Sequence, residues 1–466
     1  MILKNANIYY KGELKKGAIL IENGIIKSIY EESNNYNFNI LIENNTDQIE
    51  IDCEKRYILP GIIDIHSHLR DMEQSDKETF YSGTKAAAFS GITTVFTMPN
   101  TKPPAINAKQ VQKWKEKAKK NIYVDVGFIS GVPKSIDEQE IKKILKQGVI
   151  GFKIYPLKSL NGIDWTISEN IQKLLHISSK YQIPIFIHPD WPLKNEEVER
   201  LKRHYSKLSF LKLHNKLHSK KNEAKYVNFV LDNYVKSIEK SSSKSKCPKI
   251  HFCHISCKES FKLIQSFKEK TKEFPNINLS FEVTPHHLLL SNNIILKNES
   301  LGKVLPPLRD KAQSTYLFKQ LKEGNIFFIG TDHAPHTIME KSKPFFEAPS
   351  GFPGFETYPY LLLEKVFKNE LSLKTFVKVS SENPAKTFNL KNKGAIEEGK
   401  DADLIIVEKL QKEYSIDSQQ FITKAKFTPF ENSDLSYQKT HILLWKVFLR
   451  GDEINSEKAP LKGRIM

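Results

Sequence analysis

Eight apolar runs alternate with amphipathic segments through the middle of this 466-residue chain. Between the runs, apolar residues recur every three or four positions, as in "DEQEIKKILKQG" and "AQSTYLFKQLKEG", which is the period of a helix. Strands that are apolar throughout are buried on both faces, as in a parallel sheet covered by helices. The pattern therefore predicts an α/β fold with a TIM-type (β/α)₈ barrel. The eight runs are "YILPGIIDIHSH", "ITTVFTMPN", "IYVDVGFIS", "GVIGFKIYP", "IPIFIHPD", "KIHFCHIS", "INLSFEVTPHH" and "IFFIGTDHAPH".

The two ends of the chain have a different pattern from the middle. Asn23-Gly24 separates "AILIE" from "IIKSIY", which is a strong signal for a β-hairpin. Near the other end, "DADLIIV" and "ILLWKVFLRGDEI" are β-rich apolar runs. We therefore expect short strands at both ends. Residues 193–246 are expected to form two amphipathic helices and a solvated loop, with "SSSKSK" at 241–246 as the most flexible stretch.

The composition of the chain limits the kinds of molecule that it is expected to bind. The net charge is +17, but the lysines are spread along the chain and form no recognisable nucleic-acid-binding module, so we expect a small anionic substrate and no nucleic acid. Four cysteines do not make a disulfide framework and suit a reducing compartment. The sequence has no secretory signal and no run of eighteen apolar residues, which predicts a cytoplasmic protein without a membrane segment.

Histidines and other polar residues gather where the apolar runs end. His66 and His68 close the first run, and the period of two along a strand turns them to the same side. Active sites of such barrels lie at the carboxyl ends of the strands. An unpaired ammonium is costly at an apolar strand end, which makes Lys153 notable as well. The other members of this set are His188 in the fifth run, His254 in the sixth, and Asp332 and His336 in the eighth.

These side chains suit a metal centre. Imidazole nitrogens and a carboxylate oxygen are ligands for Zn²⁺, and four histidines with one aspartate are too many for one four-coordinate ion. We therefore expect two metal ions, with an anionic ligand between them that a carboxylated lysine would supply. Arg70 stands two residues after His68, so the period of two along a strand puts it on the same side as His66 and His68. An arginine can bind a carboxylate through two hydrogen bonds.

An ordered series of motifs resembles the dihydroorotases of the amidohydrolase superfamily. The resemblance implies that His66, His68 and Asp332 hold one zinc ion, that His188 and His254 hold the other, and that carboxylated Lys153 bridges the two. It also implies that Arg70, Asn100 and His336 bind the substrate carboxylate, with Leu305, Ser350 and Gly351 nearby. The motifs are "GIIDIHSHLRD", "TTVFTMPNT", "GFKIYP", "IFIHPD", "HFCHIS", "EVTPHHLLL", "PPLRD", "GTDHAPH", "GFPGFET", "NPAKTFNL" and "GAIEEGKDADLIIV".

The same resemblance implies a domain plan and a reaction. Residues 1–57 and 390–466 would form a composite β-sandwich domain beside a barrel of residues 58–389. The expected reaction is the reversible cyclisation of N-carbamoyl-L-aspartate to L-dihydroorotate in de novo pyrimidine biosynthesis. A zinc-activated hydroxide would attack the ring, with Asp332 as general acid and base. A homodimer, or a complex with aspartate transcarbamoylase, is the partner that the resemblance implies.

Two positions separate this chain from some of the proteins it resembles. Lys153 stands where some dihydroorotases have an aspartate, and Leu305 stands where many have an asparagine that donates to the pyrimidine ring. Leu305 therefore leaves open another cyclic amidohydrolase: a dihydropyrimidinase, hydantoinase or allantoinase. A catalytically silent homologue acting as an assembly partner is the other alternative, although all six ligand positions are retained. His286 and His287 are expected to have a structural or supporting role.

Overall fold

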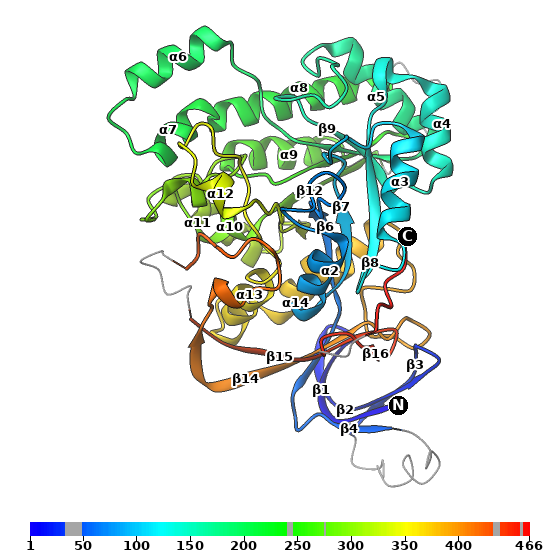
Figure 1. Ribbon diagram of the computed structural model, residues 1–466. Helices are drawn as coiled ribbons and strands as arrows, with labels where there is room; N and C mark the ends of the chain where they lie inside the picture. The colour runs from blue at the N-terminus through cyan, green and yellow to red at the C-terminus, as the bar shows by residue number, and fades with distance from the viewer. Residues whose placement is uncertain (33–48, 240–245, 275, 432–438, 457–459) are drawn as a thin grey trace.

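Eight parallel strands form one sheet that closes on itself (Figure 1). In the computed structural model, residues 1–32, 49–239, 246–274, 276–431, 439–456 and 460–466 are described. The last strand meets the first through a bridge between Ser67 and His333, where the His68 amide donates to the His333 carbonyl at 2.7 Å. The predicted barrel is confirmed. Its strands, in the order of the sheet, are β6 (Ile62–Ser67), β7 (Ile92–Thr97), β8 (Asp125–Gly131), β9 (Gly151–Ile154), β10 (Pro184–Ile187), β11 (Lys249–Phe252), β12 (Asn278–Val283) and β13 (Phe328–Ile329).

Amphipathic helices cover the outside of the barrel (Figure 1). In α4, Ile141 and Ile144 are buried while the lysines face solvent, and Asp137 caps the first turn by accepting from the Gln139 amide at 2.9 Å. The longer helices are α2 (Phe80–Phe89), α3 (Ala108–Ala118), α4 (Glu138–Lys146), α5 (Ser168–Tyr181), α8 (Lys220–Glu239), α9 (Lys258–Lys270), α11 (Lys311–Lys322) and α13 (Tyr358–Phe367). Among the described residues, no helix is both long and apolar enough to cross a lipid bilayer.

The segment after β10 differs from the prediction of two helices. It holds three: α6 (Asn195–His204), α7 (Phe210–Leu217) and α8. The α6 helix buries none of its side chains, whereas α7 buries Leu211, Leu213 and Leu217, so the two do not share one continuous apolar stripe. Residues 241–245 of the stretch expected to be flexible lie outside the described residues.

Several connections between the strands hold short helices. These are α10 (Pro285–Leu289), α12 (Ile338–Lys341), α14 (Leu373–Val377) and α15 (Asn383–Thr387), together with single turns at Lys134–Ile136, Glu299–Gly302, Lys378–Glu382 and Ser418–Gln420. The α12 helix lies in the connection between β13 and α13, at the mouth of the barrel.

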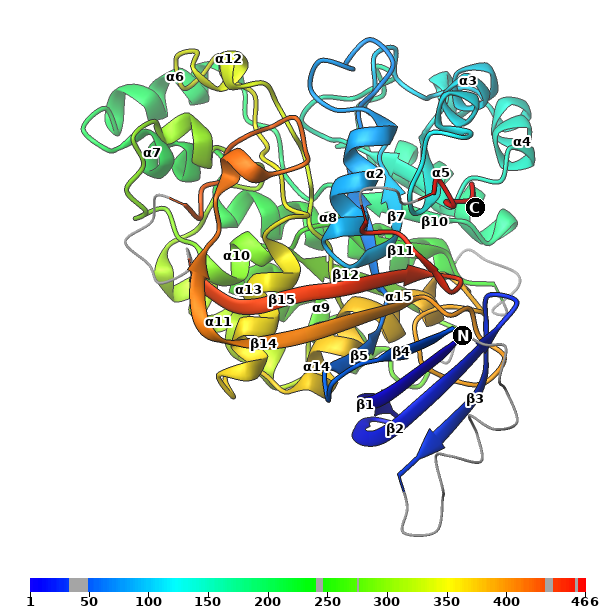
Figure 2. The same ribbon diagram turned by 60° about the horizontal axis from the view of Figure 1, so that its bottom comes forward.

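Both chain ends contribute to a second, mixed sheet below the barrel (Figure 2). The predicted hairpin is present: Glu22 pairs with Ile25, and Asn23 and Gly24 both have the positive φ that such a two-residue turn requires. The order of the sheet is β16 (Asp452–Glu453), β15 (Lys439–Leu449), β14 (Leu404–Ser415), β5 (Tyr57–Pro60), β1 (Ile2–Tyr10), β2 (Glu13–Glu22) and β3 (Ile25–Glu31), with β4 (Glu50–Asp52) paired to β1.

The first apolar run of the sequence contributes to both sheets. Ile58 in β5 pairs with Ile8 and Ile406 of the terminal sheet, and the chain enters the barrel only after Gly61. A side chain at Gly61 would come within 2.4 Å of the Thr93 hydroxyl, so the close approach there requires glycine. A buried charge cluster also joins the two sheets: the Lys393 ammonium lies 2.8 Å from Asp125 of β8, and Arg450 reaches the same carboxylate at 2.7 Å.

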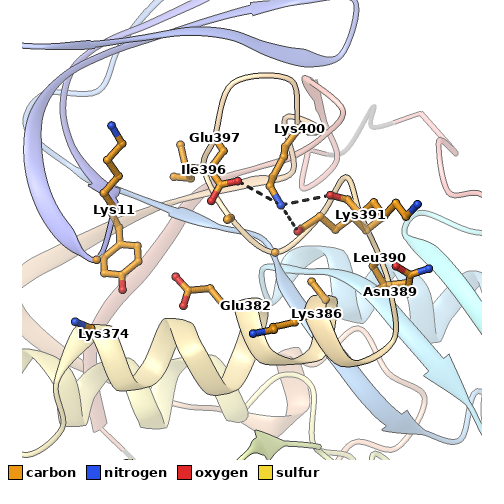
Figure 3. A pocket seen from close by; sticks show the side chains of 16 residues that line it. Lys11, Lys374, Glu382, Lys386, Asn389, Leu390, Lys391, Ile396, Glu397 and Lys400 are labelled. Carbon is orange, nitrogen blue, oxygen red and sulfur yellow. Dashed lines mark hydrogen bonds and ion pairs between the residues drawn. The ribbon is translucent and has the colours of Figure 1, made fainter. Parts of the chain in front are cut away.

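A cavity of about 600 Å³ lies away from the mouth of the barrel, between the β1–β2 turn, α14–α15 and the chain from 389 to 400 (Figure 3). Lys374, Lys386 and Lys400 line it together with the carboxylates of Glu382 and Glu397. None of the predicted metal-ligand positions lines this cavity. The chemistry of the histidine cluster therefore belongs to a different part of the molecule.

Candidate active site

The six predicted ligand positions come together at the carboxyl end of the barrel. His66 lies in β6, Lys153 lies in β9, and the other four lie one to three residues after the ends of β6, β10, β11 and β13. The imidazole rings form a continuous row, with ring centroids 5.5 Å apart from His68 to His66, 5.2 Å from His66 to His254, and 4.6 Å from His254 to His188. Three distant segments of the chain thus place imidazole nitrogen donors in one buried group.

His66, His68 and Asp332 form the tightest part of this group. The Nε2 atom of His68 lies 3.1 Å from Asp332 Oδ1, and the Nε2 atom of His66 lies 3.3 Å from the same oxygen. The ligand atoms of all three residues are within 4.8 Å of one another. This geometry suits a metal ion because three donors of the types that bind zinc converge on one point.

The opposite nitrogen of each ring is held by another side chain. Nδ1 of His66 pairs with Glu282 of β12, and Nδ1 of His68 lies 2.6 Å from the Asn100 side-chain oxygen. Partners of this kind fix the orientation of a metal-binding imidazole and leave its other nitrogen free for the ion. Asn100, expected to contact substrate, is thus also in position to orient His68.

His188 and His254 form a second donor pair. Nδ1 of His188 faces Nε2 of His254 at 3.0 Å, and both rings are buried. Within the described part of the chain, His188 Nε2 and His254 Nδ1 have no hydrogen-bond partner. Burial lowers the pKa of both histidines well below its ordinary value, so both rings are neutral and keep a lone pair to offer a cation.

Lys153 lies in the same pocket, almost completely buried at 1% exposure. Its Nζ atom is 2.8 Å from the Cys253 sulfur and 5.2 Å from the centre of the Tyr155 ring. No carboxylate lies within ion-pair distance of it among the described residues. An amine without a counter-ion in such a place is chemically suited to modification or to a metal-bridging role.

The protonation states within the first donor group follow from its charges. Burial by itself would lower the pKa of His66, but the adjacent Glu282 carboxylate raises it to about 10. Burial lowers the pKa of His68 to about 4. Burial opposes ionisation of Asp332, yet the two histidines hold its pKa below the ordinary range.

Arg70 adds a buried cation beside the metal group. Its guanidinium is 6% exposed, lies 3.2 Å from His336 Nε2, and donates to the Pro335 carbonyl at 3.3 Å. Within the described residues, no carboxylate lies at ion-pair distance from it, and burial lowers its pKa to about 10. Since arginine stays protonated even so, the site contains a positive charge with no partner of its own.

His336 is neutral and can take either tautomer. Burial lowers its pKa to about 3. Its Nε2 atom lies 3.1 Å from the Ser350 carbonyl, and its Nδ1 atom lies 3.3 Å from both Lys77 Nζ and Glu340 Oε2. One tautomer donates to Ser350 and accepts from Lys77, whereas the other donates to Glu340 and accepts from Arg70.

The connections after β12 and β13 hold the remaining predicted residues. The Gly351 amide donates to the Lys303 carbonyl at 2.9 Å, and a side chain at Gly351 would come within 2.7 Å of the Ala334 carbonyl. Leu305 is half-buried two residues after Lys303. His287 is held at both nitrogens, by Thr284 at 2.7 Å and by the Pro306 carbonyl at 3.1 Å, which is a structural role.

Three of these residues have strained backbones. Arg70, His254 and Asp332 have φ of 51°, 38° and 49°, in the left-handed region that L side chains rarely adopt. Each such residue costs about 1–3 kcal/mol and persists only where its surroundings hold it. All three residues lie in the proposed site, where their contacts hold this conformation.

Sequence reasoning overlooked Glu282, Tyr155 and Asp64 and gave Cys253 no role. Glu282 is completely buried, pairs with His66, and accepts from His251 Nε2 at 3.1 Å. Asp64 accepts from the Thr331 amide at 2.9 Å and so fixes the turn before Asp332. A carboxylate inside an apolar strand is costly unless it is paired, and that signal was present in "SFEV" and "IIDI". The proximity of Cys253 and Tyr155 to Lys153 left no comparable signal.

Comparison with known proteins places the chain among hydrolases of related fold. A model of the amidohydrolase family matches residues 57–439. The chain is 35% identical over 417 residues to dihydroorotase from Methanosphaera stadtmanae, covering 89% of this chain and 89% of the relative. It is 37% identical over 413 residues to dihydroorotase from Pyrococcus horikoshii, covering 87% of this chain and 84% of the relative.

Solved structures of lower identity share the fold. An L-hydantoinase (dihydropyrimidinase) from Arthrobacter aurescens superposes with a TM-score of 0.84 at 22% identity, covering 100% of this chain and 98% of that one. A dihydropyrimidinase from Brevibacillus agri gives 0.81 at 22% identity, with the same coverage. At this identity the likeness shows the architecture and says nothing of the substrate.

Proposed function

The chain belongs to the amidohydrolase family, and we propose that it is a dihydroorotase, which interconverts N-carbamoyl-L-aspartate and L-dihydroorotate in pyrimidine biosynthesis. Two observations support this function. Three curated relatives that are 33–37% identical to this chain, each matched over at least 84% of its own length, are dihydroorotases. The barrel mouth also combines a metal-binding group with a cation suited to a carboxylated ring.

The observation that carries the proposal is the unpaired, buried guanidinium of Arg70. Removing a cation from water costs several kcal/mol unless an anion joins it. Dihydroorotate carries a carboxylate on its ring, and an arginine can hold it through two parallel hydrogen bonds. His336 lies against the guanidinium at 3.2 Å and adds a neutral donor beside it. Substrate thus supplies the charge that this part of the site lacks.

We propose two zinc ions as the cofactor. His66, His68 and Asp332 would hold one, His188 and His254 would hold the other, and Lys153 would carry a carboxylate between them. The neutral imidazoles and the converging nitrogen atoms around Asp332 fit such a group. Carboxylation forms a bond between Lys153 Nζ and CO₂ and releases two protons, so the unpaired ammonium is replaced by a carbamate anion. When bound, such ions act as Lewis acids and lower the pKa of coordinated water to about 7.

The residues of the chain then have distinct tasks. Arg70, Asn100 and His336 orient the substrate by its carboxylate. Asp332 accepts a proton from the attacking water and delivers it to the ring nitrogen as the amide bond breaks. The histidines that surround Asp332 keep it ionised in the resting state, so it is ready to accept. In the reverse direction the carbamoyl nitrogen attacks the side-chain carboxylate carbon. Asp332 transfers the N–H proton to the departing oxygen, which takes a second proton from solvent and leaves as water.

The substrates of the alternative enzymes, the dihydropyrimidinases and hydantoinases, differ from dihydroorotate in charge. Dihydrouracil and hydantoin rings have no carboxylate and would leave Arg70 unpaired, so the site favours dihydroorotate over them. A catalytically silent homologue is disfavoured because all six ligand positions retain donor side chains and come together.

The experiment that tests the function is a panel of substrates offered to the zinc-loaded protein. We expect turnover of dihydroorotate and little of dihydrouracil or allantoin. Faster turnover of dihydrouracil than of dihydroorotate would replace the proposal with a dihydropyrimidinase, and absence of both turnover and bound zinc would support the silent homologue. Sedimentation with and without aspartate transcarbamoylase tests the homodimer and the complex that the family resemblance implies.

A further inference from the structure

The loop from residue 344 to 351 turns several of its backbone carbonyls onto two buried lysines. Lys341, the last residue of α12, places its Nζ atom 3.0 Å from the Pro349 carbonyl, 3.0 Å from the Gly351 carbonyl and 3.3 Å from the Lys303 carbonyl. Each ammonium has three donors. The Lys341 ammonium thus has as many backbone acceptors as it has hydrogens.

Lys303 makes the second set of contacts to the same loop. Its Nζ atom lies 2.6 Å from the Ala348 carbonyl, 2.7 Å from the Phe345 carbonyl and 3.4 Å from the Phe346 carbonyl. The main chain of Lys303 also takes part, since its carbonyl accepts from both Lys341 and the Gly351 amide. The two lysines together bind five loop carbonyls.

Apart from these carbonyl dipoles, nothing among the described residues balances the charge of the two lysines. Lys341 is fully buried and Lys303 is 7% exposed. No carboxylate lies within ion-pair distance of either ammonium among the residues that the structure describes. Burial lowers the pKa of Lys303 to about 8 and that of Lys341 to about 7. The loop carbonyls favour the protonated form, because only an ammonium has three hydrogens to donate to three acceptors. If the loop moved away, both ammonium groups would lose their partners together.

This loop continues directly into the proposed substrate site. The Ser350 carbonyl lies 3.1 Å from His336 Nε2, which in turn lies 3.2 Å from the Arg70 guanidinium. Gly351 has a φ of 125° and packs against Ala334, so its position leaves little room for adjustment. Contacts of Lys341 with Pro349 and Gly351 therefore lie on both sides of Ser350.

We propose that Lys341 and Lys303 are positioning residues whose ammonium groups act as built-in cations and hold the 344–351 loop in its substrate-binding conformation. They touch neither the metal group nor the reacting atoms, and they act through Ser350, Gly351 and His336. The proposal rests on the dihydroorotase function only for its kinetic readout. The conformation of the loop can be measured without any activity.

The first test is Lys341→Met, which keeps the length of the side chain and removes its charge. We expect KM for dihydroorotate to rise by up to roughly 100-fold, with a much smaller change in kcat, because the loop orients substrate and takes no part in proton transfer. We also expect faster proteolytic cleavage within residues 342–351. The matched control is Lys343→Met, since Lys343 is exposed two positions away. That variant should behave as the wild type does.

The second test is chemical rescue of Lys341→Ala. Propylammonium or butylammonium ions should restore KM and loop protection by placing a cation among the three carbonyls, and butanol should not. If Lys341→Met does not fold, the same measurements on Lys303→Met test the proposal.

Unchanged KM and unchanged cleavage in a folded, zinc-loaded Lys341 variant would overturn the proposal, and so would equal rescue by butanol. If the wild type does not turn over dihydroorotate, the proposed function fails, while the cleavage pattern still tests the role of the lysines.

Discussion

Replacing Arg70 with methionine tests how this site selects its substrate. The change keeps an unbranched chain as far as the position of Nε and removes the rest of the guanidinium. Arg70 is 6% exposed and has no carboxylate partner in the described residues, so the change breaks no ion pair within the protein. The guanidinium also contacts His336 and the Pro335 carbonyl. A substrate without a carboxylate is therefore needed to separate loss of the substrate contact from a displaced His336.

The magnitude follows from the burial of the group. Removing one partner of a buried, hydrogen-bonded charge pair costs about 2–5 kcal/mol. A value of about 3 kcal/mol corresponds to a loss of roughly 100-fold in kcat/KM. Because the carboxylate is bound in the ground state and the transition state alike, we expect most of this loss in KM.

The assay compares two substrates in the wild type and in the variant. Ring opening of dihydroorotate and of dihydrouracil is followed by absorbance, with zinc content measured on the same samples. Dihydrouracil lacks the carboxylate, so its kcat/KM should be unchanged or higher in Arg70→Met. A loss of equal size for both substrates, or an unchanged KM for dihydroorotate, would refute the role of Arg70 as the carboxylate-binding residue.

Three further predictions concern the proton carrier, the metal group and the pH dependence of stability. Asp332→Asn should lower kcat by roughly 10²–10⁴-fold while much of the zinc remains bound, because the amide keeps a ligand oxygen and cannot carry the proton; near-normal turnover would remove Asp332 from this role. Glu282→Gln should weaken zinc binding by roughly 10–100-fold, since His66 loses the carboxylate that orients it; the exposed Glu73→Gln is the control, and equal zinc affinity in the two variants would contradict the reasoning. Burial, with the neighbouring Glu78 charge, raises the pKa of Glu356 to about 7 from an unfolded value near 4.5. The folded state therefore holds this proton more tightly than the unfolded state does. The resulting gain in the free energy of unfolding is at most about 3 kcal/mol; it is complete below about pH 4.5 and is lost as the pH rises through 7. Urea unfolding of the wild type and of Glu356→Gln between pH 5 and 8 measures this pH-dependent stability. An identical pH dependence in the two proteins would show that Glu356 is not its source.

Much of the architecture could be predicted from local pattern. The alternation of apolar runs and helical segments predicted the barrel, and Asn23-Gly24 predicted the first hairpin, because both signals depend on residues that are close in the chain. The positions of the donor residues could be predicted for the same reason. His66 and Asp332 each stand at the end of a strand, and parallel strands in a closed barrel bring their carboxyl ends to one rim.

The pairings within the site were decided only by the tertiary structure. That Glu282 holds His66 across 216 positions, and that Lys153 lies against Cys253, depends on which strands become neighbours and on which face each side chain occupies. The same holds for Lys341 and Lys303, which read as ordinary members of a lysine-rich chain until folding buries them among loop carbonyls. Sequence periodicity reports the environment of one element at a time. Contacts between side chains from different elements arise only when closure of the barrel sets their register, so they had to be observed.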